Sequence, residues 1–127
     1  MERHVGILAI FCTLWGALAM LVGLSLLLLS AGALAILFGP DGDAVGFAAG
    51  VTATAFAVMG AVALLWGAAH VGASVLLRRR HPAGRVLMLG LGVVNLLVLP
   101  FGTALGAYAL WILLTDDGRR LFEPVAA

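Results

Sequence analysis

The feature that most constrains this chain is a set of three long runs without a charged side chain, at residues 5–40, 44–77 and 86–115. In the core of a lipid bilayer every backbone polar group must be satisfied within the chain, so such runs form helices or the strands of a closed barrel. Barrel strands alternate apolar and polar residues with a period of two, and these runs do not. The pattern therefore predicts an all-α membrane protein.

The composition supports the same fold class. Hydrophobic residues make up 64% of the 127 positions and charged residues 10%, whereas soluble domains are about 45–50% apolar and about 25% charged. The length accommodates three or four spans of about 20 residues, so we expect a single integral membrane domain over residues 1–127. The apolar run after Arg3 exceeds the ~7–15 residues of a signal-peptide core, which predicts a retained span.

The positions of the arginines favour four spans over three. Cytoplasmic loops next to membrane spans are enriched in Lys and Arg. Spans at 5–38, 46–77, 82–99 and 102–115 place Arg3, the Arg78–Arg85 loop and Arg119–Arg120 on one side. With three spans the last pair would lie on the opposite side. The sequence thus predicts a polytopic bundle of four helices with both termini in the cytoplasm.

The last two spans are short. Helices of about 18 and about 15 residues rise only about 27 and 22 Å, so their turn at Pro100–Thr103 is predicted to stop short of the outer surface. Thr103 is expected to cap the fourth helix, and Gly102 to give the tight turn its freedom. The first two spans are too long for the bilayer, and they are expected to shield this hairpin and to extend past it near Asp41 and Asp43.

Two polar residues inside the runs are candidates for function. An ionisable residue within a membrane span is a functional hypothesis by default, and His70 is the only histidine in the three runs. We expect a neutral histidine, hydrogen-bonded and packed against another helix, while a proton or ligand role and metal binding stay open. Asn95 is expected to bond across helices or to satisfy carbonyls near Pro100.

Two further sets of residues are assigned to packing and to orientation. Small residues four positions apart allow helices to approach closely in lipid. Arginines beside a span orient the chain and attract anionic lipid headgroups. The packing set is Gly23, Gly46, Gly50, Gly72, Gly102 and Gly106, and the orientation or headgroup set is Arg78, Arg79, Arg80 and Arg85.

Several function classes lack the residues that they require. The chain has no lysine for Schiff-base chemistry, one cysteine (Cys12), and no basic patch larger than Arg78–Arg80 to bind nucleic acid. Ion-coupled transporters build their coupling site from charged residues within the spans, and these runs hold none. Only Cys12 and His70 could pair as nucleophile and base. We therefore expect neither an enzyme nor a bound cofactor or metal.

Three classes of function remain open. The first is a structural or assembly role, in which the chain self-associates or accompanies a larger membrane complex. The second is an oligomeric pore with rings of Asp41 or Asp43 at its mouth. The third is binding of lipid or a small hydrophobic ligand beside the short hairpin. The glycine rows and the uncharged spans favour the first.

The C-terminal segment carries a family resemblance. "LLRRRHPAGRVLMLGLGVVNLLVLPFGTALGAYALWILLTDDGRRLF" resembles the C-terminal half of a widespread group of small, uncharacterised bacterial membrane proteins with a P-x-G-T-A-L-G-x-Y-x-L-W motif. The arginine loop departs from the group's tryptophan-containing pattern. The resemblance implies four helices in the bacterial inner membrane and transfers no activity. The matching positions are Asn95, Pro100, Gly102, Thr103, Gly106, Tyr108, Trp111 and Phe122.

Overall fold

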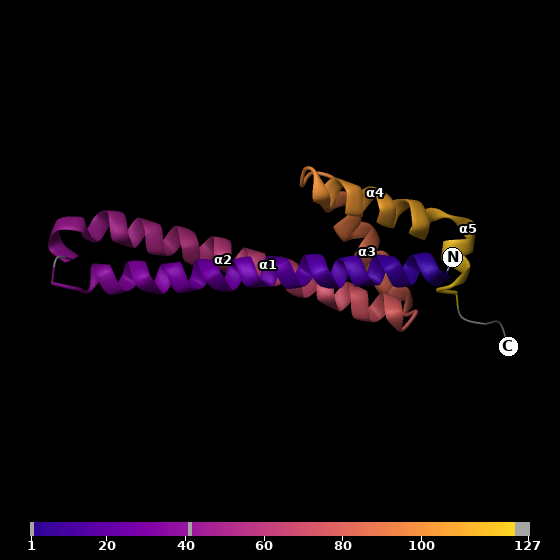
Figure 1. Cartoon of the computed structure of the whole chain (residues 1–127), viewed down its shortest axis with the longest axis horizontal. Helices are drawn as coiled ribbons and strands as arrows, with labels where there is room; N and C mark the ends of the chain where they lie inside the picture. The colour runs from indigo at the N-terminus through magenta and orange to yellow at the C-terminus, as the bar shows by residue number, and fades with distance from the viewer. Residues whose placement is uncertain (1, 41, 124–127) are drawn as a thin grey trace. The chain divides into compact units, whose positions relative to one another are not determined.

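The computed structural model describes residues 2–40 and 42–123, and only the backbone of residues 42–44. That part of the chain contains helices and no strand, which confirms the predicted all-α class. Figure 1 shows the helices in chain order. They are α1 (Glu2–Leu37), α2 (Gly42–Arg78), α3 (Pro82–Asn95), α4 (Phe101–Leu114) and α5 (Asp116–Arg120).

The chain divides into two compact units, Ala17–Ala68 and Met1–Gly16 with Ala69–Ala127. Two helices, Glu2–Leu37 and Val45–Arg78, are long and apolar enough to cross a membrane, by length and composition alone. α3 and α4 have 14 residues each and are shorter than the ~20 residues of a full helical span.

Unit Ala17–Ala68 is a helical hairpin with a seam of small residues. A Cβ added to Gly23 would lie 2.8 Å from the carbonyl oxygen of Gly60, and one added to Gly60 would lie 2.9 Å from the carbonyl oxygen of Gly23. Ser30 crosses the seam and donates a 2.7 Å hydrogen bond to the carbonyl oxygen of Ala53. The seven-residue steps from Gly23 to Ser30 and from Ala53 to Gly60 match the period of helices packed side by side.

Because the seam is made of small residues, the large side chains of this unit point outward. Phe38 and Phe47 have 83% and 88% of their surface exposed. Apolar side chains surround both helices rather than forming one stripe, which is the pattern of a helix in an apolar medium. The other large exposed apolar residues of the unit are Leu18, Met20, Leu21, Val22, Leu24, Leu28, Leu29, Leu34, Ile36, Val45, Val51, Val58, Met59, Val62 and Leu65.

The second unit holds the more substantial core. α3 and α4 run side by side as a hairpin (Figure 1). A Cβ added to Gly106 would overlap the carbonyl oxygen of Gly92 and lie 3.1 Å from the backbone nitrogen of Leu96. The backbones of the two helices therefore touch where these glycines meet. The largest fully buried apolar side chains of this unit are Leu8, Cys12, Leu77, Met88, Ile112 and Leu113.

The hairpin turns earlier than the sequence predicts. α3 ends at Asn95 rather than at Leu99, and α4 begins at Phe101, so the turn covers residues 96–100. The N–H of Val98 donates to the Asn95 carbonyl at 2.9 Å, and the N–H of Thr103 donates to the Val98 carbonyl at 3.0 Å. These bonds satisfy backbone groups that the two helix ends leave open. Leu97 is 83% exposed at the turn.

The start of α3 agrees with the sequence. Pro82 occupies its first turn, as predicted, and His81 is its N-cap. The His81 Nδ1 accepts a hydrogen bond from the N–H of Ala83 at 3.2 Å. Further along the chain, α5 was not anticipated. Its Gly118 lies so close to the Ile112 carbonyl that an added Cβ would overlap it.

Candidate functional site

The two polar candidates from the sequence form one buried pair. His70 comes from α2 and Asn95 is the last residue of α3, and both side chains are fully buried. The Asn95 Nδ2 lies 2.8 Å from the His70 Nε2. A hydrogen bond between helices thus joins two residues 25 positions apart. The predicted packing of His70 against another helix is confirmed.

The chemistry of this pair is that of a neutral imidazole. In this orientation of the Asn95 amide its nitrogen donates to the His70 Nε2, and that geometry requires an imidazole ring with its proton on Nδ1. The Asn95 Oδ1 is buried without a hydrogen-bond partner among the described residues. The described residues contain no group of three or more His, Cys, Asp or Glu side chains that could hold a metal. The two side chains thus form a polar contact between α2 and α3.

Cys12, the other half of the possible nucleophile–base pair, has a different neighbour. Its thiol donates to the Met88 Sδ at 3.4 Å, and both side chains are buried. Cys12 thus packs as a small apolar residue against a thioether.

Thr103 has a different role from the one predicted. Thr103 was expected to cap the fourth helix, but Pro100 is the N-cap residue of α4 and no side chain bonds there. The Thr103 Oγ1 instead donates to the carbonyl oxygen of Leu96 at 2.9 Å, across the turn. The expectation for Gly102 is also wrong, because no described glycine has a positive φ. A larger residue does not fit at position 102, because a Cβ added to Gly102 would lie 2.6 Å from the Val98 Cβ.

The predicted packing glycines fall into two groups. At Gly23, Gly102 and Gly106 an added Cβ would meet backbone or Cβ atoms within 3 Å. At Gly46 an added Cβ would lie 3.3 Å from a methyl group of Leu37. An added Cβ on Gly50 or Gly72 would meet nothing within 4 Å. The glycines outside the predicted set whose added Cβ would meet another atom within 3 Å are Gly60, Gly84 and Gly118.

Hydroxyl groups also form a hydrogen bond between helices that the sequence did not predict. The Thr13 Oγ1 donates its hydrogen to the Ala9 carbonyl at 2.9 Å. The hydrogen in its 2.6 Å contact with Ser74 therefore comes from Ser74. Ser25 and Thr54, by contrast, return their hydrogen bonds to their own helices.

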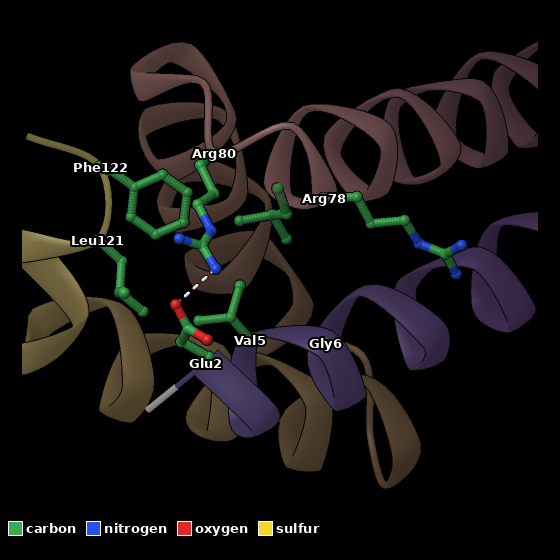
Figure 2. A pocket seen from close by; sticks show the side chains of 8 residues that line it. Glu2, Val5, Gly6, Arg78, Arg80, Leu121 and Phe122 are labelled. Carbon is green, nitrogen blue, oxygen red and sulfur yellow. Dashed lines mark hydrogen bonds and ion pairs between the residues drawn. The ribbon is translucent and has the colours of Figure 1, made fainter. Parts of the chain in front are cut away.

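A pocket lies at the arginine-rich end of the second unit (Figure 2). Its volume is about 200 Å³, and the Arg80 Nη2 lies 2.5 Å from the Glu2 Oε1 at its edge. In Figure 2 the Arg78 side chain extends away from this ion pair. Arg85 lies elsewhere, and its Nε donates to the Leu113 carbonyl near the end of α4 at 3.0 Å. The pocket is lined by Glu2, Val5, Gly6, Leu77, Arg78, Arg80, Leu121 and Phe122.

Arg80 holds a backbone conformation that usually belongs to glycine. Its φ is 53°. Its N–H donates to the Leu77 carbonyl at 3.0 Å, and the N–H of His81 donates to the Leu76 carbonyl at 3.0 Å. This pair of bonds is the Schellman motif, in which the left-handed residue after the helix is commonly Gly. A left-handed L-residue costs about 1–2 kcal/mol.

An aromatic group also lies at the polar end of this unit. The His4 Nδ1 lies 3.2 Å from the Tyr108 hydroxyl, and the His4 ring stands edge-on to Trp111 with centroids 6.0 Å apart. These contacts join the start of α1 to α4. Aromatic side chains of this kind with polar tips are enriched at membrane–water interfaces.

Two predicted features have no structural outcome. Asp41 and the side chain of Asp43, the proposed ring at a pore mouth, lie outside the described residues.

No family model, curated protein or solved structure matches the chain.

Proposed function

We propose that the protein is a structural component of a bacterial inner membrane that self-associates or accompanies a larger membrane complex. The observation that carries the proposal is the length of its apolar helices. α1 has 36 residues and rises about 54 Å, against about 30 Å for the hydrocarbon core. A tilt of about 40°, at the upper end of the observed range, still leaves about 41 Å along the membrane normal.

At least ~11 Å of α1, and ~24 Å without tilt, would therefore extend beyond the hydrocarbon. The end that extends is the tip of the hairpin, residues 28–51, because all seven arginines belong to the other unit. The only charged residues of this tip are Asp41 and Asp43. Exposed apolar patches of this kind mark protein interfaces. We propose that protein covers the tip.

A shallow groove on α2 suits a second helix. It is lined by Gly46, Phe47, Gly50, Val51, Thr54 and Ala55. Gly46, Gly50 and Thr54 are spaced four residues apart, and an added Cβ at Gly50 would meet nothing. Small residues at this spacing let two helix backbones approach closely in lipid. Gly46 contacts Leu37 of its own hairpin, but the space beside Gly50 is open and Phe47 and Val51 are exposed, so we assign this face of α2 to contact with a neighbouring chain.

The proposed topology has four segments. α1 and α2 cross the membrane, and α3 and α4 form a short hairpin that rises about 21 Å and turns within the bilayer. The arginine loop and both termini lie in the cytoplasm, in accordance with the positive-inside rule. The bacterial location rests on the resemblance of the C-terminal segment. No catalytic step is proposed.

Native mass spectrometry of the full chain in nanodiscs tests the assembly role. Phe47→Ala removes an exposed aromatic side chain from the tip, and Leu65→Ala is the matched control on the same helix, 72% exposed. We expect a wild-type oligomer or complex that Phe47→Ala weakens at least about tenfold, as loss of an interface anchor does. Leu65→Ala should change little. A wild-type monomer without any bound protein would exclude the proposed role.

A further inference from the structure

We infer that the pocket beside Arg80 binds the phosphate headgroup of an anionic phospholipid, and that the Glu2 carboxylate occupies Arg80 when the lipid is absent. The inference rests on the proposed membrane location. It goes beyond the assembly role, because it assigns a ligand to a different part of the chain. The ligand would bind at the cytoplasmic surface, while the proposed assembly contact lies at residues 28–51.

The pocket combines the Arg80 guanidinium with an apolar floor; Arg78 also lines the pocket, but its side chain extends away from the Arg80–Glu2 pair (Figure 2). The Arg80 guanidinium meets Glu2 at the edge, and Figure 2 shows Val5, Leu121 and Phe122 around the same space. The volume of about 200 Å³ equals that of roughly six to seven water molecules. An amphiphile with an anionic head matches both parts of this lining. A free phosphate ion would leave the apolar floor without a contact.

Arg80 can exchange Glu2 for another anionic partner. The side chains of Arg80 and Glu2 are 56% and 66% exposed, and exposed ion pairs contribute little to stability. A phosphodiester offers two unesterified oxygens, which match the planar fork of a guanidinium at least as well as a carboxylate does. The lipid phosphate can therefore replace Glu2 without loss to the fold.

The backbone at Arg80 supports a role beyond helix termination. A glycine would satisfy the Schellman motif without strain, and the chain uses glycine at 17 other positions. Strained residues persist where their side chain has a function. The left-handed conformation of Arg80 (φ 53°) accompanies its placement at the pocket edge, whereas neighbouring Arg79 does not line the pocket.

The test compares lipid binding to the full chain by native mass spectrometry, with phosphatidylglycerol and phosphatidylcholine added to the detergent-solubilised protein. Arg80→Gln and Arg79→Gln remove the same charge from adjacent positions. We expect Arg80→Gln to weaken phosphatidylglycerol binding about fivefold, the contribution of one arginine at an anionic surface, and Arg79→Gln to change it less than twofold. Equal losses of phosphatidylglycerol affinity in the two variants would mean that the arginines act only through the overall charge of this surface, and would overturn the proposed site.

Two further variants sharpen the result. Arg80→Gly removes the same guanidinium and relieves the backbone, so it should lose the lipid while its unfolding midpoint stays level or rises. Glu2→Gln frees Arg80 and should tighten phosphatidylglycerol binding, whereas Glu123→Gln, which removes an exposed carboxylate outside the pocket, should not. Tightening by both carboxylate variants to the same extent would contradict the competition between Glu2 and lipid.

The source of the phosphate and the independence of the two proposals are tested together. Inorganic phosphate, added as competitor, should not displace bound phosphatidylglycerol at millimolar concentration, and complete displacement would show a site for the free ion. The oligomeric mass of Arg80→Gly should equal that of the wild type. If Arg80→Gly loses phosphatidylglycerol but keeps the wild-type oligomeric mass, the result supports the lipid site independently of the assembly role. If the variant loses both the lipid and the assembly, the two sites are not separate and this part of the inference is overturned.

Discussion

The His70–Asn95 pair makes the most specific energetic prediction. Leucine has the branching and approximate size of asparagine, so Asn95→Leu removes the amide with little change of shape. In the variant the His70 Nε2 loses the donor that lies 2.8 Å away. His70→Leu is the reciprocal change, and the double variant removes both polar groups from a fully buried site.

The magnitudes follow from the cost of a buried group without its partner. Losing one partner of a buried hydrogen bond costs about 1–3 kcal/mol, whereas replacing both partners by apolar groups can be nearly neutral. Asn95→Leu should cost about 1–2 kcal/mol, toward the lower part of that range, because it also removes the buried Oδ1 that has no partner among the described residues. His70→Leu leaves a whole amide without its imidazole and should cost about 2–3 kcal/mol.

The double variant should then be more stable than the sum of the two changes predicts. Hydrogen bonds between membrane helices show coupling energies of about 0.6 kcal/mol on average and about 1.7 kcal/mol at most. We expect about 1 kcal/mol for this pair. The assay is reversible unfolding of the purified chain in mixed micelles, with Ser25→Ala as control, since Ser25 bonds only to the Leu21 carbonyl of its own helix. Coupling indistinguishable from zero would refute the hydrogen bond as a stabilising contact.

The hairpin turn supplies two further predictions, measured by the same unfolding assay. Gly106→Ala should destabilise the chain by about 1–3 kcal/mol, the cost of overpacking, because its Cβ would overlap the Gly92 carbonyl; Gly90→Ala, where a Cβ meets nothing, should be neutral or stabilising. Thr103→Val should cost about 1–3 kcal/mol by leaving a turn carbonyl without its donor. Thr54→Val, whose hydroxyl bonds within its own helix, should cost far less, and equal costs would contradict the role of Thr103.

The sequence predicts the helical class and the existence of the C-terminal hairpin. Both follow from uncharged runs that are interrupted by residues unsuited to a helix, such as Pro100. The pairing of His70 with another helix is also predictable, because a buried histidine requires a hydrogen-bond partner. The partner itself depends on how α2 and α3 pack, and the sequence left Asn95 with two alternatives.

The positions of the turn and of the packing faces could not be read from spacing. The turn begins at Leu96 because Asn95 and Thr103 supply bonds that end α3 five residues before Pro100. Gly23 and Gly50 both belong to small-residue rows, yet only Gly23 faces its own hairpin. Likewise, nothing in "RRRHP" separates Arg80 from Arg79, because the left-handed backbone that places it arises from the end of α2.

The placement of the chain across a membrane is tested most directly by labelling with a membrane-impermeant maleimide. Cys12 is buried and can be replaced by alanine, so that single cysteines at Arg79, Phe38 and Leu97 report on three exposed positions. The account predicts labelling of Arg79→Cys only from the cytoplasmic side, of Phe38→Cys only from the opposite side, and of Leu97→Cys from neither. Labelling of Arg79→Cys and Phe38→Cys from the same side would contradict it, because α1 and α2 would then not cross the membrane.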